Sequence, residues 1–182
     1  MKKVSVLNFS MLIIFLSCLL LPGMMKAQED SKRIMDDSKD AKAAFLKSDP
    51  AMANLFKNSY GYAIFPNVGK GAAGVGGAAG KATVYEKGKA IGTAQMIQVT
   101  VGAQAGGQAY REVVFFENKD ALDRFKENKV EFSGQASAIA AKEGASANAN
   151  YRDGVVVFTQ EKSGLMLEAS LGGQKFTYKP LM

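Results

Sequence analysis

The stretch from Tyr60 to Lys89, YGYAIFPNVGKGAAGVGGAAGKATVYEKGK, has a composition that fits three different kinds of segment, and the expected fold depends on which of them it forms. It contains eight glycines and four lysines but a single acidic residue, Glu86. Such a stretch is compatible with a phosphate-binding loop, with a flexible linker, or with a β-rich part of a packed domain. The residues around the glycines distinguish these possibilities.

A phosphate-binding loop is not supported by the positions of the lysines. The P-loop needs Gly-Lys followed by Ser or Thr, but Gly80-Lys81 is followed by Ala82 and Gly69-Lys70 is followed by Gly71. Residues 74–79, GVGGAA, match the dinucleotide fingerprint G-x-G-x-x-A. That fingerprint requires a helix to begin at the glycines, whereas strand-forming residues follow here, so nucleotide binding is disfavoured.

The linker interpretation fails on composition. Flexible linkers are rich in Gly and Ser and are polar, but this segment is rich in Gly, Ala and Val. Tyr60–Phe65 has the residues of a strand, ended by Pro66-Asn67, and Glu86-Lys87-Gly88 has the composition of a hairpin turn. We therefore expect a β-rich segment whose glycines allow bends, bulges or close approach of backbones.

Two helices are expected before this segment. Residues 29–47 place an apolar stripe on one helical face, and Asp49-Pro50 is a good start for a second short helix. The opposite face of the first helix carries Asp36, Asp37 and Asp40, so its net charge does not favour a membrane surface. We expect the stripe to cover the domain's own core. Its members are Ile34, Met35, Ser38, Ala41, Phe45 and Leu46.

The remainder reads as strands interrupted by one helix. Asn118 is positioned to cap a helix over about 118–129, and strands are expected on both sides of it. The sequence predicts an α+β fold: a strongly curved or barrel-like antiparallel sheet rich in strand glycines, with N-terminal helices (29–58) and one helix inserted in the β-rich part (59–182). The expected strands are 81–85, 89–92, 95–102, 111–117, 131–140, 145–149, 155–159, 165–171 and 175–178.

The N-terminus has the pattern of a secretory signal peptide. Lys2-Lys3 precede a mostly apolar run from Val4 to Met25, and Ala27 supplies a small residue for cleavage. We expect residues 1–27 to be removed, leaving one domain over 28–182 in an exported protein, periplasmic or associated with the outer membrane. An uncleaved anchor and a lipoprotein site at Cys18 are the alternatives.

The composition after residue 27 lacks the side chains that several kinds of catalytic and metal site require. Without Cys18 the chain has no Cys, and it has no His or Trp anywhere. An imidazole base, a thiolate nucleophile and an ordinary zinc or copper site are then all missing. Glu112, Glu117 and Tyr110 near a glycine pair remain the candidates for an enzyme, but alternating strand charges are more typical of a solvated face. We expect no cofactor and no catalysis.

The surplus positive charge is local. Residues 28–182 carry net +3, with −1 over 29–49, +4 over 50–90 and zero over 91–182. A basic region of this kind attracts phosphates, anionic headgroups or an acidic protein, although lysines at hairpin turns also serve solubility alone. Nucleic acid is disfavoured by the small net charge. The surplus comes from Lys57, Lys70, Lys81, Lys87 and Lys89.

Three segments in order resemble the lipid-binding SYLF domain family, which includes a domain of yeast cortical actin-patch proteins. They are YGYAIFPNVGKGAAGVGGAAGKATVYEKGKAIG from Tyr60, QVTVGAQAGGQAYREVVFFENKDALDRFK from Gln98, and GLMLEASLGG from Gly164. The likeness extends from about Asp30 to Tyr178. It implies a non-enzymatic domain that binds phospholipid membranes; some fungal relatives also bind actin filaments.

Two function hypotheses follow. In the first, the five lysines of residues 50–90 attract anionic phospholipid headgroups of the cell envelope, and Phe45 or Phe65 inserts among the acyl chains. In the second, exposed strand edges and a Gly/Ala surface pair with an envelope protein or with copies of the same chain.

Overall fold

In the computed structural model, residues 7–130, 138–163 and 173–181 are described. The chain forms two compact units, Met1–Arg33 and Ile34–Met182, and the first helix runs through their boundary. Among the described residues, no helix combines the length and apolar character needed to cross a membrane. The elements are α1 (Leu7–Ser48), α2 (Met52–Asn58), β1 (Gly61–Glu86), β2 (Lys89–Phe116), α3 (Lys119–Lys126), β3 (Ile139–Ala140), a 3₁₀ turn η1 (Ser146–Asn148), β4 (Val155–Ser163) and β5 (Gln174–Pro180).

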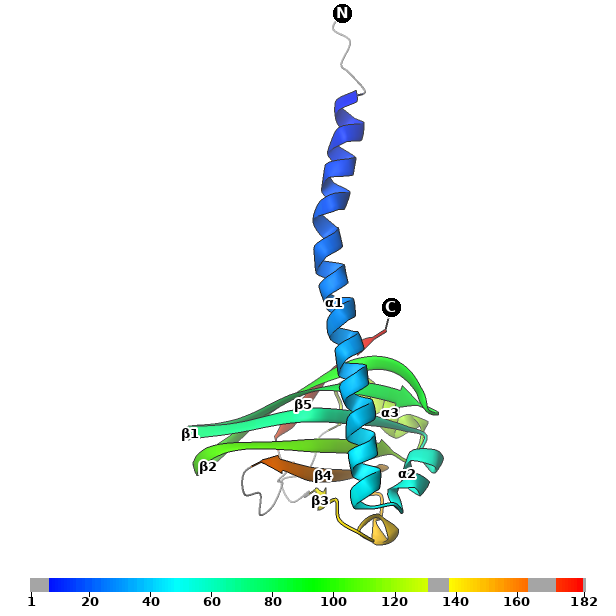
Figure 1. The fold of residues 1–182 in the computed structure, drawn as a ribbon, viewed down its shortest axis with the longest axis vertical. Coiled ribbons are helices and arrows are strands. Elements are labelled where there is room, and N and C mark those ends of the chain that lie inside the picture. The colour runs from blue at the N-terminus through cyan, green and yellow to red at the C-terminus, as the bar shows by residue number, and fades with distance from the viewer. Residues whose placement is uncertain (1–6, 131–137, 164–172, 182) are drawn as a thin grey trace, which may run out of the picture. The chain divides into compact units, whose positions relative to one another are not determined.

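The glycine-rich stretch is one arm of a long antiparallel ribbon (Figure 1). β1 pairs with β2 from Gly61↔Phe116 to Glu86↔Lys89. The predicted hairpin turn is confirmed: Lys87 and Gly88 have φ of 48° and 78°, which is the left-handed region that a two-residue turn of this type requires. The predicted strand end at Pro66-Asn67 is wrong, because the register shifts there and pairing resumes at Val68. Proline is tolerated at such a bulge.

The two halves of the ribbon pair with different strands on the free side of β2. β4 pairs with residues 109–116 of β2, β5 pairs with residues 92–98, and β3 adds to β4 in parallel. The α+β class and the mainly antiparallel sheet are thus confirmed. The barrel-like form is not, because the pairings of the described residues leave the sheet open.

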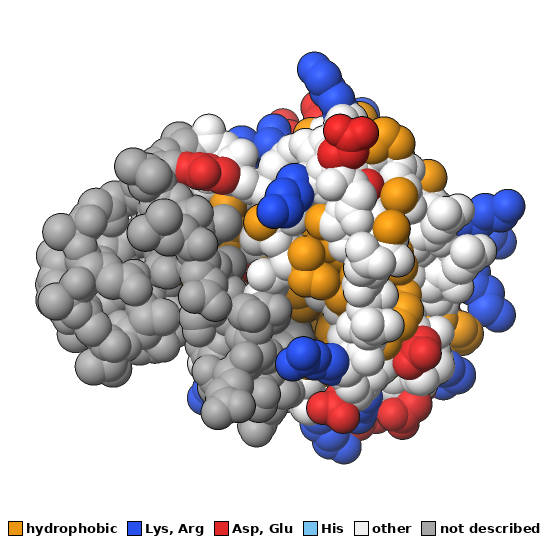
Figure 2. All heavy atoms as spheres, turned by 90° about the horizontal axis from the view of Figure 1, so that it is seen from below, with side chains coloured by type: hydrophobic (Ala, Val, Ile, Leu, Met, Phe, Trp, Pro, Cys, Tyr) orange, Lys and Arg blue, Asp and Glu red, His pale blue; other side chains and the backbone are white. Residues whose placement is uncertain are grey.

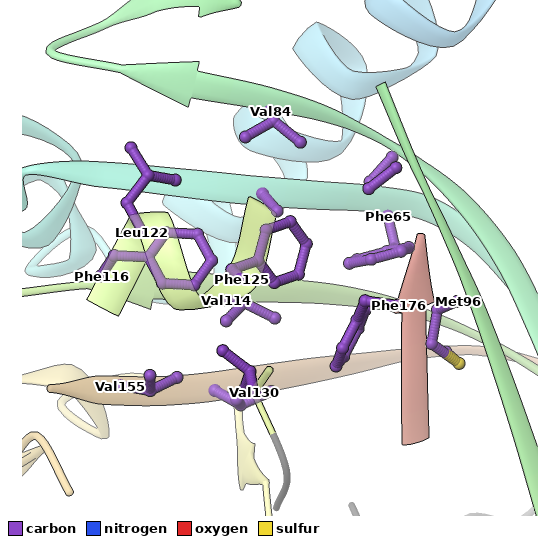
Figure 3. Close-up of a cluster of buried hydrophobic side chains, with 14 of the residues drawn as sticks. Phe65, Val84, Met96, Val114, Phe116, Leu122, Phe125, Val130, Val155 and Phe176 are labelled. Atoms are coloured by element: carbon purple, nitrogen blue, oxygen red, sulfur yellow. The ribbon is translucent and has the colours of Figure 1, made fainter. Parts of the chain in front are cut away.

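Bending of the ribbon brings its two halves onto one core. Phe65 from the first half lies 5.9 Å, ring centre to ring centre, from Phe176 of β5, which pairs with Met96 of the second half. Figure 3 shows these side chains together, with Leu122 and Phe125 of α3 beside them. At Gly80, an added Cβ would come within 2.9 Å of the Val68 side chain. Glycine is needed here because the two halves approach too closely for a side chain.

The opposite face of the first half is covered by α1 and α2. Ala41 and Phe45 pack in a second core with Phe56, Phe115 and Phe158. Ser38 donates to the Ile64 carbonyl oxygen at 3.3 Å, and its Oγ lies 3.0 Å from Oγ1 of Thr83. The expectation that the stripe of this helix covers the domain's own core is confirmed.

Of the local predictions for residues after Phe116, the helix cap is confirmed and one predicted strand is wrong. Asn118 caps α3 as predicted, since its side-chain oxygen accepts from the Ala121 amide at 3.0 Å, although the helix ends at Lys126 rather than near 129. The strand predicted at 145–149 is wrong, because the chain forms η1 there. Small residues carry no periodic apolar pattern, so they gave a weak strand signal. The strand predicted at 165–171 and most of that at 131–140 lie outside the described residues.

Asp49 holds the corner between α1 and α2. Its buried carboxylate accepts hydrogen bonds from the amides of Ala51 (3.2 Å), Gly144 (3.3 Å) and Ser146 (2.7 Å). Burial raises the pKa of Asp49, but the hydrogen bonds from Ser146, Ala51 and Gly144 outweigh burial and leave the pKa below its ordinary value. The ionised form therefore ties the helical segment to the loop before η1.

Replacing Asp49 by Ala is expected to lower the free energy of unfolding by about 2–4 kcal/mol, because amide donors lose a charged acceptor. The difference from wild type should be full above about pH 4 and shrink as the pH falls through the depressed pKa of the folded state. Urea unfolding at several pH values measures it, with the exposed Asp40→Ala as the control. Equal losses for the two variants would contradict this role.

The absence of a side chain at Gly92 allows β5 to pack closely against β2. A Cβ at this position would clash with the ring of Tyr178 and lie 2.5 Å from the Lys179 carbonyl oxygen, whereas a Cβ at Gly69 would meet nothing within 4 Å. We expect Gly92→Ala to cost about 1–3 kcal/mol through overpacking and Gly69→Ala to cost nothing measurable. Chemical denaturation of both variants provides the test, and equal midpoints would show that β5 adapts without strain.

Candidate functional site

The five lysines singled out from the sequence lie on several different elements. Lys57 lies in the last turn of α2, Lys81 lies on β1, Lys87 lies in the hairpin turn and Lys89 begins β2, with all four side chains exposed. Lys70 lies on β1, but its side chain is outside the described part. The five lysines thus come from α2, β1, the hairpin turn and the start of β2, and their role in lipid binding stays a prediction.

Acidic side chains balance the positive charge near the turn. Glu86 accepts a hydrogen bond from the Tyr60 hydroxyl at 2.7 Å and pairs with Lys126 of α3 at 3.4 Å. The Tyr60 hydrogen bond and then Lys126 lower the pKa of Glu86. Lys87 lies over the Tyr60 ring at 5.2 Å, and Asp123 pairs with Lys126 at 3.3 Å. Figure 2 likewise shows basic and acidic side chains mixed around the face seen from below.

The two phenylalanines predicted to insert into lipid are inside the protein. Phe45 lies in the core under α1, and Phe65 lies in the core inside the bent ribbon (Figure 3). Both side chains are fully buried. Their contact with lipid stays a prediction, and it would require the packing around these rings to open.

A different basic surface emerges from the pairing of β5. Along this strand Phe176 and Tyr178 face the core, so Lys175, Thr177 and Lys179 face outward. The register places Lys175 opposite Ile97 and Thr177 opposite Gln95, and residues directly opposite each other share a face of the sheet. We call this surface the lysine face; it consists of Ala79, Lys81, Thr93, Gln95, Ile97, Lys175, Thr177 and Lys179.

Charge and exposure set the lysine face apart. It has three lysines and no acidic residue. Ile97, which lies opposite Lys175, is 51% exposed and is the one large hydrophobic side chain that is exposed among the described residues. Within the described part of the chain, neither Lys175 nor Lys179 has an acidic partner. The face thus combines an apolar side chain with cations about 5 to 15 Å away, given ordinary strand spacings.

Lys175 and Lys179 were not predicted from the sequence, although a signal was present. The run Lys175-Phe176-Thr177-Tyr178-Lys179 alternates polar and aromatic residues, which predicts two outward-facing lysines on one strand. Over residues 91–182 as a whole, ten acidic residues cancel ten basic ones, so the net charge of this part of the chain does not reveal the two lysines. Proximity to Lys81 depends on the pairing of β5 with β2, which joins residues as far apart in the sequence as Gly92 and Pro180, and composition does not reveal such pairing.

A metal-dependent site finds no support in the described residues, which contain no group of three or more His, Cys, Asp or Glu side chains able to hold an ion. Glu112 and Tyr110, considered above for an enzyme, are buried in the inner core instead of lining a surface. The lysine face is therefore the best candidate for a binding function.

Comparisons with known proteins agree with the resemblance seen in the sequence. Residues 97–180 match the family described as Ysc84, Las17-binding protein actin regulator, whose domain is also called SYLF. The chain is also 30% identical over 141 residues to Beta cell expansion factor A of Aeromonas veronii. That alignment covers 72% of this chain and 50% of the relative, so the chain spans about half the length of the protein it matches.

Proposed function

The chain belongs to the SYLF family, and from this premise we propose that it is a non-enzymatic protein that docks on anionic phospholipid surfaces through the lysine face. Family membership indicates an interaction role related to lipid or actin. Anionic lipid is the finer proposal, and the observation that carries it is that Lys175 lies opposite the exposed Ile97, with Lys179 on the same face of β5, and that neither lysine has an acidic partner among the described residues.

The energetics favour reversible docking. A lysine near an anionic membrane surface contributes about 1 kcal/mol, so Lys175 and Lys179 together contribute about 2 kcal/mol. Burying the exposed part of Ile97 adds about 1 kcal/mol. The sum corresponds to weak binding that salt screens, which suits a domain that associates with a surface and leaves it without chemical turnover.

The proposed setting is the cell envelope of a bacterium. The basic start, the apolar run and Ala27 motivate export with removal of residues 1–27, and export brings the domain to phospholipid headgroups. Detection of a mature chain beginning near Gln28 in the envelope fraction tests this setting.

A protein partner is the second candidate. The family description names binding to another protein, and in the described pairings β1 has β2 as its one strand partner. Strand addition to the other edge of β1, as in the interaction hypothesis, is how such a partner would bind. Charge reversal on the lysine face would leave such edge pairing intact.

Reversing two charges tests the lipid proposal. Wild-type protein should sediment with vesicles containing phosphatidylglycerol, and less as salt rises. Lys175→Glu/Lys179→Glu should lower the partition coefficient at least tenfold, because each reversal removes an attraction of about 1 kcal/mol and adds repulsion. Thermal unfolding checks that both side chains, which are exposed, are dispensable for folding.

Two matched doubles make this test specific. Lys142→Glu/Arg152→Glu changes the net charge equally at exposed sites outside the lysine face and should bind nearly as wild type. Lys87→Glu/Lys89→Glu reports on the lysines identified from the sequence. Equal loss in all three doubles would mean that net charge alone drives binding, and equal wild-type sedimentation with neutral and anionic vesicles would refute the proposal.

A further inference from the structure

The inner row of β2 contains a buried carboxyl group that the proposed function does not use. Glu112 is fully buried in the middle of the sheet, where it pairs with Phe65 of β1 and Thr159 of β4. Gln174 at the start of β5 is 4% exposed, and its Nε2 donates to Oε2 of Glu112 at 3.2 Å. This side-chain contact links β5 to a part of β2 with which it makes no backbone pairing.

No described charge compensates this carboxyl. The neighbouring side chains on the inner face are the aromatic ring of Phe65, the hydroxyl of Thr159, and Val114 and Tyr110 on β2 itself. β5 contributes Gln174 and then Phe176. On β4 the exposed Glu161 lies opposite Tyr110. Its carboxylate would disfavour a second negative charge on Glu112. Arg111 is directed elsewhere, toward Gln160 at 3.1 Å.

Two oxygen atoms of this contact have no hydrogen-bond donor among the described residues: Oε1 of Glu112 and Oε1 of Gln174. An ionised carboxylate and an amide oxygen are both acceptors, so they cannot satisfy each other. Leaving two buried acceptors unsatisfied is costly. A single proton on the Glu112 oxygen would convert it into a donor and satisfy both atoms.

We propose that Glu112 is a neutral carboxylic acid in the folded protein and donates its Oε1–H to Oε1 of Gln174. The result is a cyclic acid–amide pair: Gln174 gives Nε2–H to one carboxyl oxygen and accepts O–H from the other. One proton thereby completes the side-chain connection between β2 and β5 across the core. This pair is independent of the lysine face and of lipid binding.

The electrostatics agree with a bound proton. Burial raises the pKa of Glu112 to about 7, and the hydrogen bond from Gln174 offsets only part of that rise. Burial, and then the proximity of Glu112, raises the pKa of Tyr110, which stays neutral throughout this range.

The sign of the pH effect follows from proton linkage. The folded state holds the Glu112 proton up to about pH 7, whereas the unfolded chain releases it near the ordinary value of 4.5. Stability from this group is therefore greatest below pH 4.5, falls as the pH rises to about 7, and stays low above it. The connection between β5 and β2 weakens in the same interval.

Glu112→Gln isolates this effect. The new amide can donate Nε2–H to Gln174 and accept from it, so it reproduces the cyclic pair without a titrating proton. Relative to this variant, the wild-type unfolding constant should increase up to about 300-fold between pH 4 and pH 8, the factor for a shift from 4.5 to about 7. The exposed Glu117→Gln controls for loss of an ordinary carboxylate and should keep the wild-type pH profile.

A second measurement needs only wild-type protein and remains available if the variant fails to fold. Carbon-13 NMR of the glutamate carboxyl groups should show Glu112 titrating near pH 7, well above the ordinary value of 4.5. Titration of Glu112 near 4.5 in the folded protein would overturn the proposal. So would a Glu112→Gln variant that loses stability with rising pH in parallel with wild type.

Discussion

The pairing of β1 with β2 is the constraint on which the rest of this structure depends. Successive side chains of a strand point to opposite faces, so one register assigns every residue of both strands to a side. The inner row receives Phe65, Met96 and Val114, which build the core with α3 and β5. The outer row is covered by α1 and α2 along the first half, and it becomes the lysine face along the second half. A slip of one residue would exchange these rows.

Features encoded by adjacent residues could be predicted from the sequence. The apolar stripe of α1, the turn at Lys87-Gly88 and the cap at Asn118 each depend on a short stretch with a specific physical signal. The extent of the strands could not be predicted in this way. Pro66 signals a break, but the long pairing partner absorbs it as a bulge. The candidate site was found only in part, because Lys81 joins Lys175 and Lys179 through pairing of distant segments.

Charge acts differently in three places in this domain. Beside the hairpin turn, Glu86 and the acids of α3 balance the lysines, so a charge count along the sequence overstates the positive field there. On the lysine face, Lys175 and Lys179 have no acidic partner among the described residues, so their positive field is retained there. In the core, the acid–amide pair proposed for Glu112 would remove the charge altogether by keeping a proton. Three-dimensional pairing, more than composition, therefore determines which charges are available to a partner.

The most direct measurement of docking through the lysine face places an environment-sensitive label on that surface. In a Cys18→Ser background, a label at Ile97→Cys should move into an apolar environment when vesicles rich in phosphatidylglycerol are added. A label at the exposed Asn54→Cys of α2 should remain in water. If the label at position 54 transfers and the label at position 97 stays hydrated, the membrane contacts another face of the domain, and docking through the lysine face is contradicted.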